Sequence, residues 1–289
     1  MVKISLIITS FKDPRVFNLV EQLLPSNPYE IIIADGGTSG ELLEKFRALE
    51  SDTVKFYTLP GNIAETRYQV QDIIKGDISV FIDTDELPTD KWLLRLTNPI
   101  VYGEYDFAFG STRPLEPPDS IYSKYLADYD EFLYSTILKN DILKGAMGNS
   151  AWRTEIIQKI GFDPCLGIGG EDYDLTIRAV LAGYKGKYVS NAVLLHDQNG
   201  IRTLRKFLKK MFYNYMVGAS LAYRKSGMLF SRAGKSAEAN RKFHEPLEIM
   251  MFLLKPVALL FSLMLNPWED HRLCKHTFIN INKEKVYRR

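Results

Sequence analysis

Two carboxylates stand one residue apart in the segment Phe81-Ile82-Asp83-Thr84-Asp85, directly after an apolar run that is typical of a buried strand. Asp83 and Asp85 offer the hard oxygen ligands that Mg²⁺ and Mn²⁺ prefer. With Glu86, three carboxylates occupy four positions, and their mutual repulsion favours a bound cation over a solvated acidic turn. Such a cation can neutralise the negative charge of a diphosphate.

A second acidic residue follows another predicted strand, in the segment Ala34-Asp35-Gly36-Gly37-Thr38-Ser39. At a strand end, the Asp35 carboxylate can accept hydrogen bonds from a ribose or a base edge, and the glycines permit a close backbone approach. An ordinary Asp-Gly turn explains the same residues equally well. Both interpretations stay open on the sequence alone.

The segment Gly169-Gly170-Glu171-Asp172 opens a predicted helix that runs from Glu171 to Ala182. The helix dipole keeps an N-terminal carboxylate ionised, as a general base requires. The same dipole also favours acidic residues with no chemical role. Because adjacent helical residues point about 100° apart, only one of the two carboxylates can easily face a given substrate atom.

His196 ends the apolar run Val193-Leu194-Leu195. A lone histidine is more often a surface residue than a ligand. Its place after a predicted strand favours a ligand, because ligands gather at the carboxyl ends of strands in open α/β sheets.

The first half of the chain alternates predicted strands with predicted helices. The strands cover 4–9, 30–34, 54–59 and 78–82, and the helices cover 16–24, 42–49 and 64–74. This alternation predicts right-handed βαβ crossovers and an α/β fold with a mostly parallel sheet. The polar residues named above then lie at one edge of that sheet. Beyond Tyr105 the pattern is less regular, and a further helix is expected near Thr154.

The composition of the 289 residues is that of a globular protein with a formal net charge of +2. This charge gives no argument for nucleic-acid binding. No signal peptide is visible at the N-terminus. Cys165 and Cys274 match no metal-ligand spacing, so we expect no disulfide bond and a reducing, cytoplasmic setting.

The last third of the chain changes character, and we expect a catalytic domain over 1–200 and a helical region over 201–289. A basic amphipathic helix is predicted over 202–216, with one face formed by Leu204, Phe207, Leu208, Met211, Phe212 and Tyr215. The segment 249–265 is almost wholly apolar but slightly short for a membrane span, and Lys255-Pro256 interrupts it. It is interpreted as a helical cap, a homodimer interface, or a peripheral or monotopic anchor on the cytoplasmic membrane leaflet.

Together these motifs resemble the family 2 glycosyltransferases of the GT-A fold, over roughly Val2 to Asp197. Matching segments are Ser5-Leu6-Ile7-Ile8-Thr9-Ser10-Phe11, the strand and turn from Glu30 to Ser39, Gly61-Asn62-Ile63-Ala64-Glu65-Thr66-Arg67, Asp83-Thr84-Asp85, and Gly170-Glu171-Asp172-Tyr173-Asp174-Leu175 with Arg178 and Gly183-Tyr184. The sequence departs from the family at Gly40, where Asp is frequent, and at Tyr68, where Asn is frequent.

The resemblance implies an inverting transfer of a sugar from a UDP- or GDP-sugar to a hydroxyl of a glycan or a polyprenyl-phosphate-linked acceptor. Asp172 would be the base, with Glu171 as the alternative. Asp85 and His196 would bind Mn²⁺ or Mg²⁺, and Asp83 would contact the metal or the ribose. The remaining nucleotide-sugar-binding residues would be Thr9, Phe11, Asp35, Gly36, Arg67 and Thr84. No QxxRW motif is apparent after His196, which favours addition of a single sugar.

Other classes fit the sequence less well. A catalytically inactive sugar-nucleotide-binding or scaffold protein would not need to keep both acidic motifs. A nucleotidyltransferase would need a glycine-rich phosphate loop after the first strand, where Ser10-Phe11-Lys12-Asp13 stands. A dinucleotide oxidoreductase would need a GxGxxG motif after a strand, and none is present.

Overall fold

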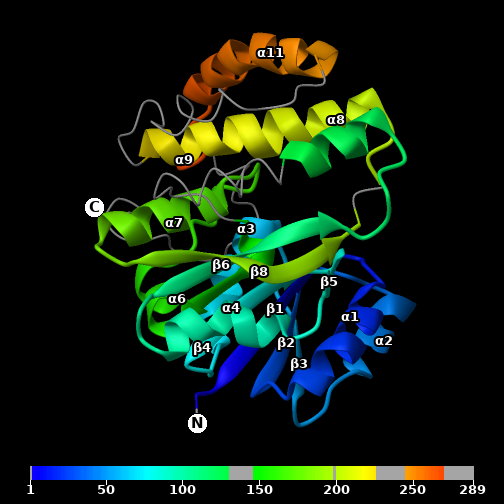
Figure 1. The fold of residues 1–289 in the computed structure, drawn as a ribbon, viewed down its shortest axis with the longest axis vertical. Helices are drawn as coiled ribbons and strands as arrows, with labels where there is room; N and C mark the ends of the chain where they lie inside the picture. The colour runs from blue at the N-terminus through cyan, green and yellow to red at the C-terminus, as the bar shows by residue number, and fades with distance from the viewer. Residues whose placement is uncertain (1, 130–145, 198–199, 226–244, 270–289) are drawn as a thin grey trace.

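One mixed sheet forms the centre of the protein in the computed structural model, which describes residues 2–129, 146–197, 200–225 and 245–269. Its eight strands run in the order β3-β2-β1-β4-β7-β6-β8-β5 (Figure 1). Their bounds are β1 Ile4–Ser10, β2 Glu30–Asp35, β3 Val54–Thr58, β4 Ile78–Asp83, β5 Glu86–Pro88, β6 Phe107–Pro114, β7 Ser150–Arg153 and β8 Gly186–His196.

The half of the sheet formed by β1 to β4 is parallel, as the sequence predicts. Each of these strands lies within one residue of its predicted bounds. The register pairs Ser10 with Asp35 and Thr9 with Asp83, so the polar residues that follow the strands meet at one sheet edge. The expected α/β fold is therefore confirmed.

The other half mixes both strand directions. β7 runs antiparallel to β4 and β6, while β6 and β8 are parallel with a shift in register between Gly110 and Ser111. The short strand β5 is antiparallel to β8 and places Glu86 opposite His196. The sequence predicts neither β6 nor β7, because strands in this half lack the regular alternation with helices.

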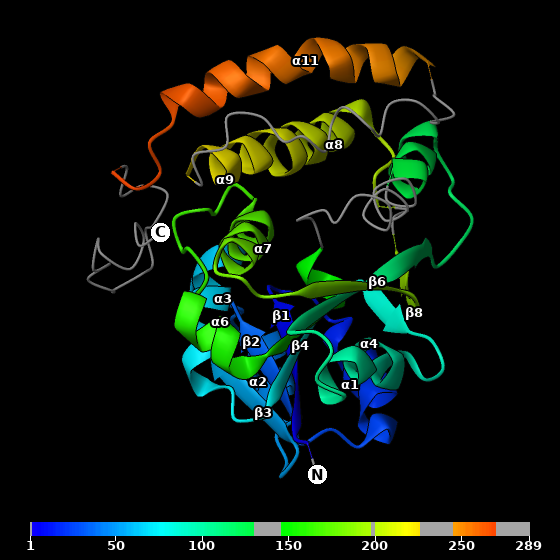
Figure 2. The same ribbon diagram turned by 60° about the vertical axis from the view of Figure 1, so that its left-hand side comes forward.

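Helices cover both faces of the sheet, as Figure 2 shows. Side chains of α1 (Val16–Leu23), α2 (Glu41–Arg47) and α4 (Trp92–Val101) pack with Leu6 and Ile8 of β1. Side chains of α3 (Ile63–Val70), α6 (Thr154–Ile160) and α7 (Glu171–Leu181) pack with Ile7 on the opposite face. Alternate residues of one strand thus enter two separate cores, as a strand buried on both faces requires.

The C-terminal region forms a further helical layer above α7 (Figures 1 and 2). It contains α8 (Leu204–Lys209), a π-helix η4 (Lys210–Gly218), α9 (Ala219–Lys225) and α11 (Glu245–Met264). Phe207 and Met211 are buried as the predicted amphipathic pattern requires, whereas Leu204 is exposed because no described element covers the start of α8. Helix α11 runs through Pro256 without ending there.

Helix α11 is the one helix among the described residues that is long and apolar enough to cross a membrane. Leu247, Met251 and Ala258 pack inward against the layer below. The opposite face is exposed and carries Ile249, Phe252, Leu253, Val257, Leu260, Leu263 and Met264. Only 17% of the apolar window is buried inside the protein.

The expectation of unpaired cysteines is wrong, because Cys165 is disulfide-bonded in the structure. Its partner lies outside the described residues. The distance between two cysteines along the chain does not exclude a disulfide bond here, since the C-terminal region folds back onto this part of the protein. Trp268, for example, donates a hydrogen bond of 2.6 Å from Nε1 to Asp163, two residues before Cys165.

Candidate active site

The carboxylate of Asp85 lies beside the imidazole of His196, with 3.2 Å between Oδ2 and Nε2. Asp85 follows β4 in a tight turn, and the pairing of β5 with β8 brings the end of β8 to that turn. The backbone N–H of Asp197 also donates to the Asp85 carbonyl at 2.9 Å. Two residues 111 positions apart in sequence are therefore held together by the sheet itself.

Two further cations, Lys210 and Arg15, act on this pair. Burial alone would raise the pKa of Asp85, but its hydrogen bond with His196 and the positive charges nearby together outweigh burial. Lys210 and Arg15 add positive charge, and the pKa of Asp85 falls to about 2. Burial lowers the pKa of His196, but the Asp85 and Glu86 carboxylates together raise it above its ordinary value.

A buried arginine joins the two acidic motifs. Arg67 of α3 is only 4% exposed. Its Nη2 donates to Asp83 Oδ1 at 2.9 Å, and its Nη1 donates to Glu171 Oε1 at 2.6 Å. Asn62 caps α3 by accepting from two backbone N–H groups of the first turn, and this fixes where Arg67 emerges. The sequence predicts Arg67 as a nucleotide ligand and gives no hint of this bridge.

Asp172 lies in the first turn of α7, behind Gly170, whose φ of 91° begins the helix from the left-handed region. Burial and the neighbouring Glu171 carboxylate raise the pKa of Asp172 to about 7, against the opposing charge of Arg67. Burial also raises the pKa of Glu171, although Arg67 opposes the shift. The expectation that the helix dipole keeps this carboxylate ionised is therefore wrong near neutral pH, because burial and Glu171 outweigh the dipole. Asp172 is the less buried of the two and titrates near neutral pH, both of which suit a general base.

The third carboxylate of the acidic segment, Glu86, is buried beneath the turn. Burial and the charge of Asp83 raise its pKa to about 8. Gly148 lies against both carboxylates, and a Cβ there would come within 2.5 Å of Asp83 Oδ2 and 2.6 Å of Glu86 Oε2. Crowded acidic groups in a space that only glycine leaves open are compatible with a cation nearby.

No three His, Cys, Asp or Glu side chains within the described ranges converge closely enough to hold a metal by themselves. Asp85 and His196 offer one carboxylate and one imidazole. This donor set fits Mn²⁺ or Mg²⁺ when phosphate oxygens and water complete the coordination, since such ions commonly bind through one or two carboxylates plus substrate phosphates.

The predicted nucleotide side lies at the ends of β1 and β2. Asp35 is fully buried, and its Oδ2 accepts from the backbone N–H groups of Gly37 and Thr38 while its Oδ1 accepts from the Thr38 hydroxyl. The carboxylate thus builds the turn, and its role toward a nucleotide stays a prediction. A Cβ on Gly36 would lie 2.9 Å from the Gly61 carbonyl, so this close approach requires glycine.

Phe11 stands beside this turn with 60% of its surface exposed, which is unusual for a phenylalanine. Its ring edge lies close to Gly36, where a Cβ would meet the ring at 3.5 Å. Thr9, at the end of β1, is buried beside Asp83 in the sheet register. Phe11 is therefore the one aromatic face of the predicted set that is open to solvent.

Three charged residues of the site are missing from the sequence prediction. Asp13 accepts a 2.6 Å hydrogen bond from the Thr84 hydroxyl and is paired with Arg15 at 2.6 Å. Both follow β1, so the rule that ligands gather after strands could have found them. Lys210 begins η4, and no sequence signal connects it with the acidic segment.

Comparison with known proteins gives a match to glycosyl transferase family 2 over residues 7–161. The chain belongs to this family. The matched part includes Arg67 and the segment Asp83-Thr84-Asp85 but ends before Glu171, so it says nothing of Asp172 or His196. A search of curated proteins finds no match.

Solved structures with the same fold include two kinds of glycosyltransferase. Glucosyl-3-phosphoglycerate synthase from Mycobacterium tuberculosis, in complex with Mn²⁺, UDP and glucosyl-3-phosphoglycerate, superposes with a TM-score of 0.52 at 16% identity, covering 80% of this chain and 82% of that chain. Mannosyl-3-phosphoglycerate synthase from Rubrobacter xylanophilus gives a TM-score of 0.55 at 12% identity, covering 80% of this chain and 77% of that chain. At these identities the likeness establishes the fold.

Proposed function

We propose that the protein is an inverting glycosyltransferase that moves one sugar from a UDP- or GDP-sugar to an acceptor hydroxyl. The observation that carries this proposal is the Arg67 bridge, with Asp83 on one side and Glu171 on the other. One buried guanidinium brings the predicted donor end and the predicted base end into a single site. A binding or scaffold protein has no need of this juxtaposition.

At the donor end, Asp85 and His196 would hold a divalent cation, and Asp83 would contact the cation or the ribose. When bound, the cation would neutralise charge that develops on the leaving diphosphate. Lys210 and Arg15 would add positive charge at the same place. Thr9, Phe11, Asp35, Gly36 and Thr84 would line the nucleotide, with the exposed Phe11 ring as a stacking surface for the base.

At the acceptor end, Asp172 would take the proton from the attacking hydroxyl, with Glu171 as the alternative base. Glu171 already accepts a 2.6 Å hydrogen bond from Arg67, which leaves Asp172 better placed to act as the base. The acceptor oxygen would then attack the anomeric carbon while the bond to the nucleoside diphosphate breaks. This single displacement inverts the anomeric configuration.

The donor is identified by the thermal unfolding midpoint of the protein with a panel of UDP- and GDP-sugars, with and without Mn²⁺. A ligand raises the midpoint by mass action, so the true donor should stabilise the wild type only when Mn²⁺ is present. Asp85→Ala should lose this stabilisation. Equal stabilisation of wild type and Asp85→Ala in Mn²⁺ would remove Asp85 from the metal site.

The acceptor we propose is a hydroxyl on a glycan or on a polyprenyl-phosphate-linked glycan. Phosphoglycerate belongs in the same test panel, because the structural neighbour from M. tuberculosis is described with it. Product formation with each acceptor class, measured by mass spectrometry, distinguishes them. Transfer to phosphoglycerate alone would contradict a glycan or lipid-linked acceptor.

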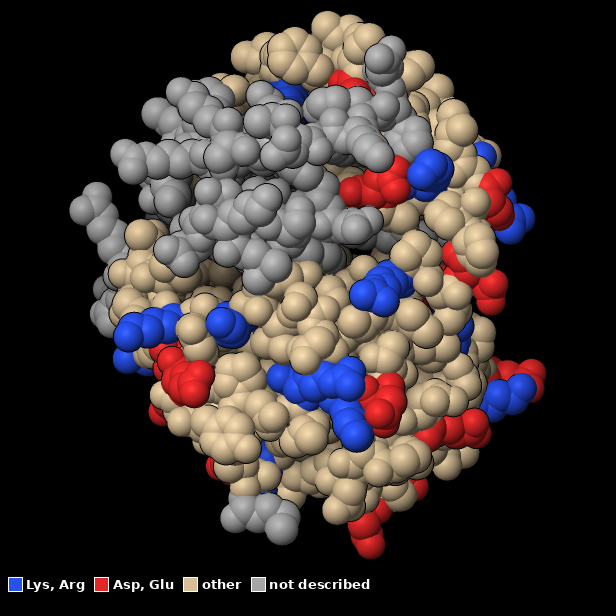
Figure 3. All heavy atoms as spheres, in the orientation of Figure 1, with Lys and Arg blue, Asp and Glu red and all other residues tan. Residues whose placement is uncertain are grey.

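We further propose that α11 attaches the protein to the surface of an anionic membrane. The disulfide bond of Cys165 removes the argument from unpaired cysteines for a reducing, cytoplasmic side. Mostly uncharged residues form the upper edge of the molecule in Figure 3, where α11 lies, and the segment from Ile249 to Leu265 contains no acidic residue. The opposite face packs on η4 and α9, which favours a helix lying in the membrane surface over one that crosses it. Exposed Arg205, Lys206 and Lys209 on neighbouring α8 complement anionic headgroups.

Flotation with phosphatidylserine vesicles tests this attachment. The wild type should co-float, and replacement of Phe252, Leu253 and Leu260 by Ser should abolish flotation. Leu94→Ser, which changes an exposed leucine on α4, is the matched control and should still float. A wild type that stays at the bottom but sediments as a dimer would identify the face as a homodimer interface.

A further inference from the structure

One face of the helix that ends at Lys225 packs along the base-bearing helix α7. Gly218, Ala222 and Lys225 stand at positions i, i+4 and i+7, so they share that face. A Cβ on Gly170 would overlap the carbonyl of Gly218, and Ala222 packs in one buried cluster with Tyr173 of α7. The C-terminal layer therefore touches the first turn of α7 through backbone and side chains.

At the end of this face, Lys225 enters a buried network of charges. Its Nζ lies 2.9 Å from Asp163 Oδ2 and 3.0 Å from Asp174 Oδ1. Arg178 pairs with Asp174 at 2.6 Å and also donates to the carbonyls of Ile160 and Gly161. Both aspartates are 1% exposed, and Lys225 is 7% exposed. The two positive and two negative charges cancel, so the network carries no net charge.

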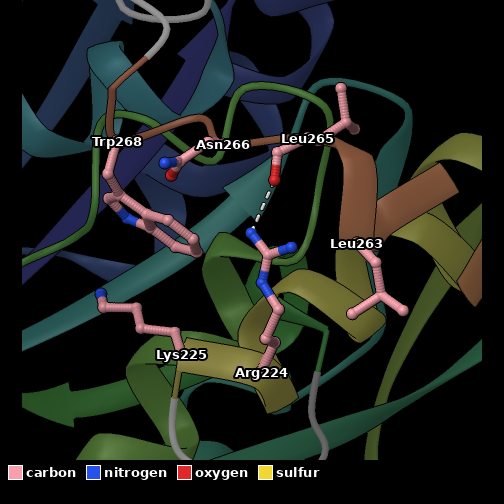
Figure 4. A pocket seen from close by; sticks show the side chains of 6 residues that line it. All are labelled: Arg224, Lys225, Leu263, Leu265, Asn266 and Trp268. Carbon is pink, nitrogen blue, oxygen red and sulfur yellow. Dashed lines mark hydrogen bonds between the residues drawn. The ribbon is translucent and has the colours of Figure 1, made fainter. Parts of the chain in front are cut away.

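A pocket of about 360 Å³ adjoins this network, lined by Arg224, Lys225, Leu263, Leu265, Asn266 and Trp268 (Figure 4). Its cations are already engaged. Arg224 donates to the carbonyls of Ser262 and Leu265, and Lys225 holds the two aspartates. The pocket therefore offers no cation for binding an anion. Arg224 instead joins α9 to the end of α11, and Lys225 holds α9 against α7 and the segment before it.

Through Asp174, this charge network contacts the first turn of α7, which also carries the predicted base Asp172. Asp174 is two residues after Asp172, which places it about 200° around the helix, on the far side of the same turn. The charged groups that act on Asp172 are Glu171 on its own helix and Arg67 from α3. On the far side of this turn, the two aspartates and the two cations of the network together present no net charge to Asp172.

We propose that Lys225 is a positioning residue of the transfer reaction, which acts through Asp174 to hold the first turn of α7 and the Asp172 carboxylate in place. The proposal rests on the proposed function. It makes the C-terminal helices part of the catalytic unit, because a residue beyond 201 fixes the base. It also assigns to Asp174, which belongs to the acidic motif by sequence, a role that does not involve substrate.

Lys225→Met tests the proposal. We expect kcat to fall at least ~10-fold while the donor KM and the affinity for nucleoside diphosphate stay unchanged, because misplacing a base affects the chemical step. Asp163 and Asp174 would then have Arg178 as their one cation. The surplus negative charge would also move the acidic limb of the pH profile of kcat/KM upward by on the order of half a pH unit. A merely structural role predicts no such directed shift. Lys45→Met, at an exposed lysine of α2, is the control.

Lys225→Met leaves one surplus negative charge buried in the network and could fold poorly for that reason. A double variant keeps the test decisive in that case. In Lys225→Met/Asp174→Asn, Asp163 and Arg178 remain and their charges balance. The pH profile should return to the wild-type position, and Asp174→Asn alone should shift it downward. Lys225→Arg, which retains the charge, should keep most of kcat.

The proposal is overturned if the folded single and double variants keep wild-type kcat and the wild-type pH profile. It is also overturned if all variants lose activity equally with no change in the profile, since the role would then be structural. In both cases wild-type transfer still supports the proposed function. A wild type that neither transfers sugar nor binds UDP or GDP with Mn²⁺ overturns both proposals.

Discussion

The nucleotide side of the site and its acceptor side are built in different ways. The turn after β2 is local, since Asp35 and its hydrogen-bond partner Thr38 are three residues apart. On the acceptor side the contacts join distant segments: Arg67 and Glu171 are 104 residues apart, and Lys225 and Asp174 are 51 apart. Local turns can be read from sequence motifs, whereas the long-range contacts decide how the base is held.

Replacement of Asp172 should give the largest effect on the acceptor side alone. Asp172→Asn keeps the shape of the side chain but cannot accept a proton, so kcat should fall by about 10²–10⁴-fold. Affinity for the nucleoside diphosphate, measured by calorimetry, should change little. An equal loss of nucleotide affinity would mean that Asp172 is structural and that the two sides are not separable.

Replacement of Arg67 should disturb both sides together. Arg67→Met leaves Asp83 and the buried Glu171 without their partner, and breaking a buried ion pair in this way costs about 3–5 kcal/mol. Urea unfolding should show this loss, whereas Arg47→Met, at an exposed arginine of α2, should cost less than ~1 kcal/mol. Similar stability of the two variants would contradict the bridging role of Arg67.

The wild-type pH dependence should report the acceptor side. The pKa of Asp172 is raised to about 7, so the carboxyl is protonated below that pH and cannot act as a base. The value of kcat/KM should therefore rise with pH through about 7 and level off above it. The Asp172→Asn variant should lose this limb. A wild-type profile that is flat from pH 5 to 8 would exclude Asp172 as the base.

A smaller effect is expected at the donor end from Lys210. Lys210→Gln removes one cation beside the predicted diphosphate position, and affinity for UDP or GDP should fall by ~10-fold, equivalent to about 1.4 kcal/mol. Affinity for UMP or GMP should fall less, because the terminal phosphate is absent. Lys209→Gln, at the exposed neighbour, should behave as wild type. Equal losses for mono- and diphosphate would place Lys210 away from the diphosphate.

These contrasts explain which parts of the protein the sequence predicts. The apolar runs of β1 to β4 and the turn residues after them carry their own local signals, and the α/β fold follows from them. The strands β6 and β7 carry no comparable alternation. The disulfide bond of Cys165 and the bridge of Arg67 depend on chain segments that meet only in the folded protein. Lys225 lies in a helix whose composition suggests an appendage, although it packs on α7.

Mn²⁺-dependent release of UDP or GDP during transfer, compared between the wild type and Asp85→Ala, is the most direct test of a metal-dependent transferase. We predict that the wild type releases one nucleoside diphosphate per sugar transferred and that chelation of the metal stops the reaction. Asp85→Ala should lose at least ~100-fold in kcat, because the metal loses a ligand beside His196. Turnover that persists undiminished in Asp85→Ala or in excess chelator would contradict a metal-dependent transferase centred on Asp83-Thr84-Asp85.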